Sequence, residues 1–75
     1  MTYIYRLEVE TDHETGDIVT SLPTLNYTAD FGGTVEESIE RLSDLAPGFI
    51  ETLIEEGVPI PDSDPLIGNK LYLAL

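Results

Sequence analysis

The 75-residue sequence predicts a single α+β domain, in which a small antiparallel sheet carries one helix on one face in the order βββαβ. Three observations lead to this fold class: segments that alternate between apolar and polar residues, one long stretch of helical periodicity, and glycines and prolines between them. A chain of this length forms one domain. We therefore expect residues 1–75 to be a single domain, with three strands before the helix and one after it.

The first two strands are predicted to form a hairpin. Residues 3–10 alternate between aromatic or aliphatic side chains and a set that includes Glu8 and Glu10, which is typical of a half-buried strand. Residues 11–17 are polar and contain a Thr-Gly-Asp turn, and residues 18–22 are rich in β-branched side chains. Pro23 has no backbone donor, so the second strand is expected to end there.

A third strand is predicted over residues 25–31. The alternation places four side chains on one of its faces: Leu25, Tyr27, Ala29 and Phe31. Asp30 falls on the other face, and Gly32-Gly33 ends the pattern. Residues 58–68 contain three prolines and predict an extended connection with no core of its own. Residues 70–75 alternate again and indicate the last strand.

The helix is predicted to start after Thr34 and to stop at Gly57. Thr34 and Glu37 have the spacing of a capping box, in which each side chain satisfies a free amide of the other residue. Apolar residues then recur at steps of three and four. They are Val35, Ile39, Leu42, Ala46, Phe49 and Leu53, widened by Leu45, Ile50 and Ile54. Pro47 interrupts the hydrogen bonding, but the apolar stripe continues across it, so we expect one kinked helix.

Charge is the strongest compositional signal. Fifteen acidic residues face three basic ones, and the net charge is −12. Such a chain repels phosphate, which argues against direct nucleic-acid binding, and attracts a basic partner. A domain this small has a marginal core. Because the sequence has no cysteine, disulfides are excluded, and we expect a homodimer to bury further apolar surface.

The sequence contains no signal for secretion or for a membrane. The start has no basic region followed by an apolar run, and no apolar segment approaches the roughly 20 residues of a membrane span. The expected location is the cytoplasm.

No residue pattern predicts a catalytic, cofactor or metal site. The single histidine, His13, lies between two acids in a polar turn that does not hold it in place. An alternative from a different class is a magnesium-dependent nuclease that uses carboxylates of the sheet face and the helix start. Its candidate ligands are Glu8, Glu10, Asp30 and Glu36.

Three segments together resemble the HicB-like antitoxin family. They are residues 17–25 (Asp-Ile-Val-Thr-Ser-Leu-Pro-Thr-Leu), residues 33–39 (Gly-Thr-Val-Glu-Glu-Ser-Ile) and residues 53–61 (Leu-Ile-Glu-Glu-Gly-Val-Pro-Ile-Pro). The mid-helix proline in residues 45–50 is similar to a short solitary branch of that superfamily, whose function is unknown. The resemblance implies a truncated ribonuclease-H-like sheet with one helix across it, in which the catalytic acids of ribonuclease H are lost.

The resemblance also implies a function. Typical members neutralise a small basic ribonuclease toxin by covering its active site, and a charge of −12 suits such a partner. The candidate partner-binding residues are the acids of the strands and the first turn: Glu8, Glu10, Asp12, Glu14, Asp17 and Asp30. Because the sequence ends at Leu75, we expect no DNA-binding segment of the kind many antitoxins carry. An orphan homodimer of the same fold remains the alternative.

Overall fold

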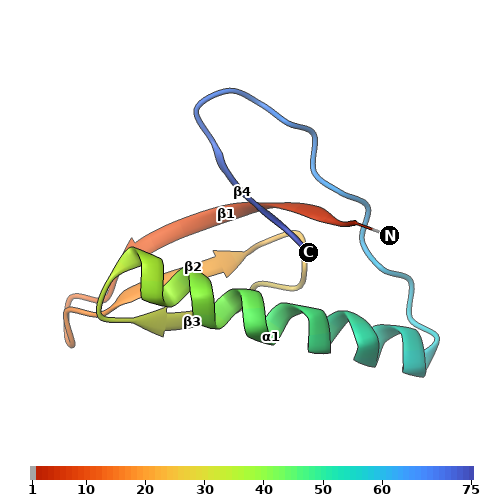
Figure 1. Cartoon of the computed structure of the whole chain (residues 1–75), viewed down its shortest axis with the longest axis horizontal. Helices are drawn as coiled ribbons and strands as arrows, with labels where there is room; N and C mark the ends of the chain where they lie inside the picture. Colours follow the sequence, from red (N-terminus) through yellow and green to blue (C-terminus); the bar gives the residue numbers. More distant parts are fainter. Residues whose placement is uncertain (1) are drawn as a thin grey trace.

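The computed structural model describes residues 2–75, so residue 1 of the predicted domain lies outside the described residues. Four strands and one helix follow one another in the predicted order βββαβ (Figure 1). They are β1 (Ile4–Thr11), β2 (Ile18–Leu22), β3 (Thr28–Gly32), α1 (Val35–Glu56) and β4 (Leu71–Ala74). The strands form one antiparallel sheet, and α1 lies across one face of it. The predicted α+β class is confirmed.

The long first strand is central in the sheet, and its two halves pair with different neighbours. β2 pairs with residues 8–11 of β1, whereas β4 pairs with residues 4–7. β3 continues the sheet beyond β2, so the strand order is β3-β2-β1-β4. The last strand in the sequence therefore lies beside the first, and β3 and β4 are the two edges.

The core lies between α1 and the face of the sheet that it covers. Alternation along β1 turns Tyr5 and Leu7 toward this core, where both are buried, and leaves Arg6 and Glu8 on the opposite face. The buried apolar residues come from the strands, the β2–β3 turn and the helix. They are Tyr5, Leu7, Leu22, Leu25, Leu42, Ala46, Ile50 and Leu53. The predicted half-buried first strand is confirmed, shifted by one residue.

The third strand starts later than predicted. Residues 23–27 form a turn, in which Asn26 and Tyr27 have left-handed φ angles of 52° and 56°. The turn is closed by hydrogen bonds from the Leu25 amide to the Leu22 carbonyl and from the Thr28 amide to the Leu25 carbonyl, both 3.0 Å long. The expected common face is therefore wrong. Leu25 is fully buried while Tyr27 is 72% exposed, because a left-handed backbone breaks the alternation of a strand.

The helix is single, as predicted, and contains Pro47. Its buried stripe is narrower than the sequence pattern suggested and consists of Ser38, Leu42, Ala46, Ile50 and Leu53. Leu45 and Ile54 were expected to widen the stripe, but they are 45% and 62% exposed. The reason is geometric, since Leu45 and Ile54 lie on the two flanks of the buried stripe, which itself continues past Pro47 through Ile50 and Leu53.

The two ends of the helix are capped by the residues that the sequence indicated. The Thr34 hydroxyl accepts a hydrogen bond from the Glu37 amide at 3.1 Å. The reciprocal half of the predicted capping box is replaced, because the Glu37 carboxylate lies 3.0 Å from Arg41. At the other end, Gly57 adopts a left-handed φ of 70°, and the Val58 amide reaches back to the Leu53 carbonyl. This arrangement is a Schellman motif.

The connection from α1 to β4 is anchored to the first strand, which differs from the expectation of a segment without a core. Ile60 packs against the core, and the Tyr5 hydroxyl donates to the Pro61 carbonyl at 2.6 Å. The amide of Asp64 donates to the Ile4 carbonyl, and its carboxylate accepts from the Arg6 amide at 2.7 Å. Burial of the ring raises the pKa of the Tyr5 hydroxyl, which keeps this group a donor.

Among residues 2–75, no helix combines the length and the apolar character that crossing a membrane requires.

Candidate protein-binding face

Within residues 2–75, no second layer of secondary structure covers the face of the sheet opposite α1. Strand register sets its side chains in rows, and one row runs from Glu10 through Val19 to Phe31. The next row runs from Glu8 through Ser21 to Ala29. Carboxylates of β1 therefore lie beside apolar side chains of β2 and β3. We call this surface the open face.

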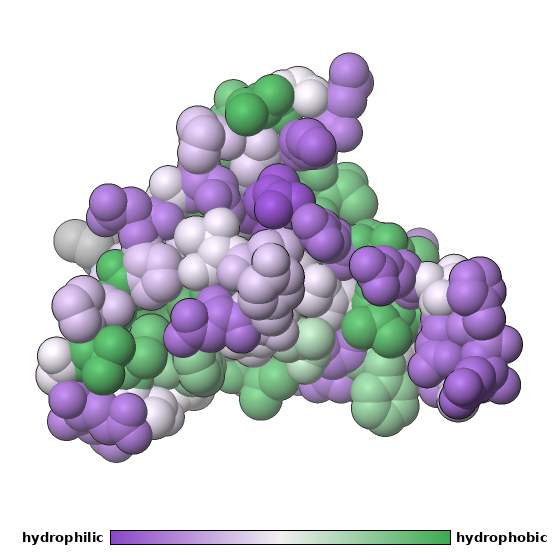
Figure 2. Space-filling view, turned by 180° about the vertical axis from the view of Figure 1, so that it is seen from behind, coloured by the Kyte–Doolittle hydropathy of each residue, from purple (hydrophilic) through white to green (hydrophobic). Residues whose placement is uncertain are grey.

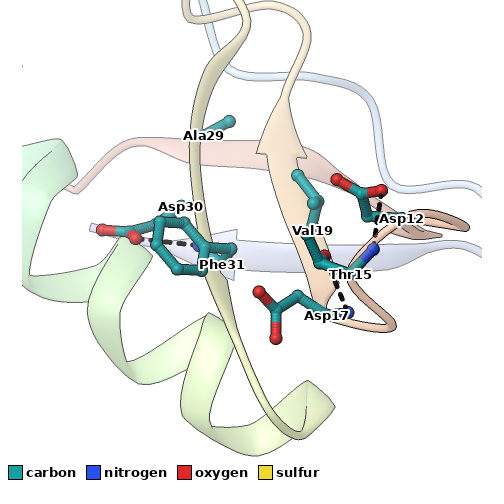
Figure 3. A pocket seen from close by; sticks show the side chains of 7 residues that line it. All are labelled: Asp12, Thr15, Asp17, Val19, Ala29, Asp30 and Phe31. Atoms are coloured by element: carbon teal, nitrogen blue, oxygen red, sulfur yellow. Dashed lines mark hydrogen bonds between the residues drawn. The ribbon is translucent and has the colours of Figure 1, made fainter.

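A hollow of about 320 Å³ lies on the open face at the end where β1 turns into β2 (Figure 3). Its lining combines apolar side chains of β2 and β3 with polar side chains of the turn and of β3. The residues are Asp12, Thr15, Asp17, Val19, Ala29, Asp30 and Phe31. Figure 2 shows hydrophilic surface gathered at the hairpin end of the molecule, beside a hydrophobic patch.

The hairpin turn holds two of the aspartates in place. Asp12 and Asp17 face each other across the turn, where the Asp12 amide donates to the Asp17 carbonyl at 2.8 Å. One carboxylate oxygen of Asp12 accepts from the amides of Glu14 and Thr15 at 2.9 and 3.4 Å. Gly16 closes the turn with φ of 78°, a conformation that glycine adopts without strain. The backbone thus positions both carboxyl groups at one end of the hollow.

Phe31 forms the aromatic part of the hollow and lies on the edge strand. Phe31 as a whole residue is 52% exposed, and the guanidinium carbon of Arg41 lies 5.6 Å from the centroid of its ring. Arg41 also donates to the Phe31 carbonyl at 3.2 Å, and the Phe31 amide donates to the Asp30 carboxylate at 2.8 Å. Because side chains occupy both backbone groups of Phe31, the β3 edge is protected there against pairing with another strand.

The six acids predicted to bind a partner fall into two groups. Asp12, Asp17 and Asp30 line the hollow. The other three lie outside it: Glu8 and Glu10 on the open face of β1, and Glu14 in the exposed turn. Glu8 is engaged by Arg6 in an ion pair.

The apolar part of the hollow was missed by sequence reasoning. Phe31 was expected to share a face with Leu25, which is buried on the helix side. Val19 and Ala29 were not singled out either. The register of the strands is the signal that would have revealed it. Val19 pairs with Glu10 on one side and with Phe31 on the other, so two apolar side chains lie next to an acidic one. Register between strands is a non-local property that the pattern within one strand does not reveal.

The four carboxylates of the nuclease alternative are not brought together. Glu8 and Glu10 lie on the open face, whereas Glu36 lies in the first turn of α1. Asp30 occupies the edge strand with its carboxylate on the Phe31 amide. Across residues 2–75, no group of three or more histidine, cysteine, aspartate or glutamate side chains is arranged to hold a metal ion.

Comparison with known proteins defines the fold. No protein-family model matches the sequence, and no curated protein matches it. Among solved structures, the chain is similar to the N-terminal domain of the Burkholderia pseudomallei antitoxin HicB, with a TM-score of 0.68 and 17% sequence identity. The match covers 100% of this chain and 95% of that domain.

The likeness extends over the whole domain, so the chain has the fold of a HicB antitoxin N-terminal domain. The resemblance predicted from three sequence segments is confirmed at the level of the fold. At 17% identity the likeness concerns architecture, and function depends on the surface residues of this chain.

Proposed function

We propose that this chain is a non-catalytic protein-binding module of the antitoxin type, which acts in the cytoplasm by docking a small basic ribonuclease-type partner. The observation that supports it most is the combination of a HicB antitoxin fold with an acidic open face. The fold alone does not determine the function. The negative charge of the surface is therefore the observation that indicates a basic partner.

Electrostatics supports a basic partner in two ways. The net charge of −12 on a body with a radius of gyration of 12.6 Å creates a strong negative field, which speeds the approach of a cationic protein. In addition, both ion pairs within residues 2–75, Arg6–Glu8 and Arg41–Glu37, are internal to one strand or one helix. Most carboxylates are therefore free to meet a partner's cations.

The geometry favours a binding surface over a nuclease site. A divalent-metal nuclease needs several carboxylates within a few ångströms of one ion, whereas the four candidate acids are spread over the open face, the sheet edge and the helix. A spread of acids over a surface suits a partner that covers the whole face.

The decisive experiment is binding to the product of the adjacent gene, if that gene encodes a small basic protein. Isothermal titration at increasing salt should give a complex that weakens steeply, because exposed charges are screened beyond about 8 Å at physiological ionic strength. An RNA-cleavage assay of the partner should show inhibition at a stoichiometric amount of this chain. Absence of binding, or affinity that does not change with salt, would contradict the proposal.

A further inference from the structure

We infer that the hollow lined by Asp12, Asp17 and Phe31 is an anchor site for a single arginine side chain of a basic protein partner. This inference rests on the proposed function and adds to it the location and chemistry of the contact. Three features support it: an exposed aromatic residue in the hollow, aspartates there that take part in neither ion pair of residues 2–75, and the absence from those residues of a side-chain cluster that could hold a metal ion.

The apolar part of the hollow suits the stem and the flat head of an arginine. Val19, Ala29 and Phe31 line it from two adjacent strands, and Phe31 is half exposed. Arginine covers apolar surface with its methylene stem and stacks its guanidinium on aromatic rings. The contact of Arg41 with Phe31 at 5.6 Å shows that this ring already accepts a guanidinium within the chain.

The carboxylates supply the matching charge. The ion pairs in the described part of the chain are Arg6–Glu8 and Arg41–Glu37, and neither includes an aspartate of the hollow. The turn hydrogen bonds engage one oxygen of Asp12 and leave the other available to a donor. Charge complementarity therefore selects a cation as the occupant of an otherwise apolar hollow.

The lack of a metal-binding cluster favours arginine over a metal ion as the occupant. Residues 2–75 contain no cluster of three ligand side chains close enough to coordinate a metal. A guanidinium presents five N–H donors in a rigid plane and needs no closed set of ligands around it. A volume of about 320 Å³ is at the small end of ligand pockets, in keeping with one side chain.

A peptide titration tests the site without a known partner. The probe is a short lysine-flanked peptide with one central arginine, and the matched control replaces that arginine with citrulline, which keeps the shape and removes the charge. Amide shifts of the full-length chain should concentrate at residues 12–19 and 29–31 with the arginine peptide and disappear with the citrulline peptide. Equal shifts with both peptides, or shifts centred on α1, would overturn the inference.

A pair of charge-matched variants separates the hollow from general attraction. Asp12→Asn with Asp17→Asn removes two charges at the hollow, and asparagine at position 12 keeps an acceptor for the turn amides. Glu51→Gln with Glu55→Gln removes two charges from the exposed side of α1. The first pair should weaken arginine-peptide binding about two- to fivefold more than the second. Equal weakening by both pairs would show attraction by net charge alone.

A third variant addresses the aromatic ring. Phe31→Leu keeps apolar contact but removes the ring face, so peptide affinity should fall by about two- to fivefold. Circular dichroism and urea unfolding establish that the variant is folded; if it is not, Phe31→Tyr serves, and this variant should retain binding. Unchanged peptide affinity in a folded Phe31→Leu variant would show that the aromatic ring does not contribute to arginine binding.

The same variants distinguish failure of the anchor site from failure of the proposed function. If a basic ribonuclease partner binds equally well to wild type and to the Asp12→Asn, Asp17→Asn pair, the anchor site is wrong and the proposed function stands. If no basic partner binds, the proposed function is wrong, and the arginine-peptide titration alone decides the anchor site.

Discussion

The hydroxyl oxygens of Thr20 and Ser38 lie 2.7 Å apart at the contact between β2 and α1, and both side chains are fully buried. Ser38 donates its own proton to the Asp30 carbonyl at 3.1 Å, so the Thr20 hydroxyl is the donor to Ser38. This short chain of hydrogen bonds joins β2, α1 and β3 in a place where the pattern of apolar residues alone predicts none. Within residues 2–75 no buried side-chain oxygen or nitrogen lacks a partner.

Removing the middle hydroxyl should destabilise the domain. In Ser38→Ala the buried Thr20 hydroxyl loses its acceptor, which should lower the free energy of unfolding by about 1–3 kcal/mol. In the double variant with Thr20→Val no unpaired hydroxyl remains, so its loss should be smaller than the sum of the two single losses. Urea unfolding of the four proteins measures this coupling, and strict additivity would contradict the hydrogen-bond chain.

The close approach of β3 to the start of α1 predicts a specific effect of a single methyl group. A Cβ at Gly32 would lie 2.9 Å from the Ser38 backbone nitrogen and 3.0 Å from the Glu37 Cβ. Gly32→Ala should therefore cost about 1–3 kcal/mol through overpacking. Gly33→Ala is the matched control, because a Cβ there meets no atom within 4 Å. Equal unfolding midpoints for the two variants would be inconsistent with this packing.

Acid should weaken the anchoring of the β4 connection through Asp64. The hydrogen bond from the Arg6 amide holds the pKa of Asp64 below its ordinary value, helped by the Thr24 hydroxyl and opposed by partial burial. A lowered folded-state pKa contributes stability above the unfolded-state value of about 3.9, and this contribution is lost as the pH falls through the folded-state pKa.

The test compares variants of equal charge across pH. Asp64→Asn should be less stable than wild type at neutral pH, and the difference should shrink as the pH is lowered below about 4. Asp62 is exposed in the same connection, and Asp62→Asn changes the net charge by the same amount. This control variant should therefore show little pH-dependent loss of stability. Urea midpoints measured from neutral to acidic pH provide the data. A stability difference that is constant with pH would show that the Asp64 charge plays no part.

If the predicted homodimer forms, its association should depend on the salt concentration. Two copies with a charge of −12 each repel one another, so added salt should strengthen self-association by screening that repulsion. Binding of a basic partner should respond in the opposite direction. Sedimentation equilibrium at low and high salt measures the first effect. If the chain stays monomeric at both salt concentrations and at high protein concentration, the prediction of a homodimer is wrong.

The local elements of this fold were predictable because short-range chemistry decides them. Thr34 caps the helix and Gly57 ends it, since both act on amides and carbonyls within one turn. Pro23 ends β2 because it cannot donate to a strand ladder. The candidate site was predictable in part, since three of the six acids proposed from charge line the hollow.

The errors occurred where distant contacts override local pattern. Leu25 lies in a left-handed turn and fills the core, although it alternates with its neighbours as a strand residue would. Ile54 fits the helical stripe but is exposed, because it lies on the flank of the stripe that α1 turns toward the sheet, beside the buried Leu53. Asp64 sits in a proline-rich connection and still pairs with the backbone of Arg6, 58 residues away in the chain.

The sequence by itself determined the acidic charge, the element order and the ends of the helix, since composition and interactions within a turn decide these. Tertiary structure alone decided that β4 lies beside β1, which face of the sheet α1 covers, and that Phe31 meets Asp12 and Asp17 in one hollow. Strand neighbours and register depend on burying apolar side chains across the whole chain, so no single segment specifies them.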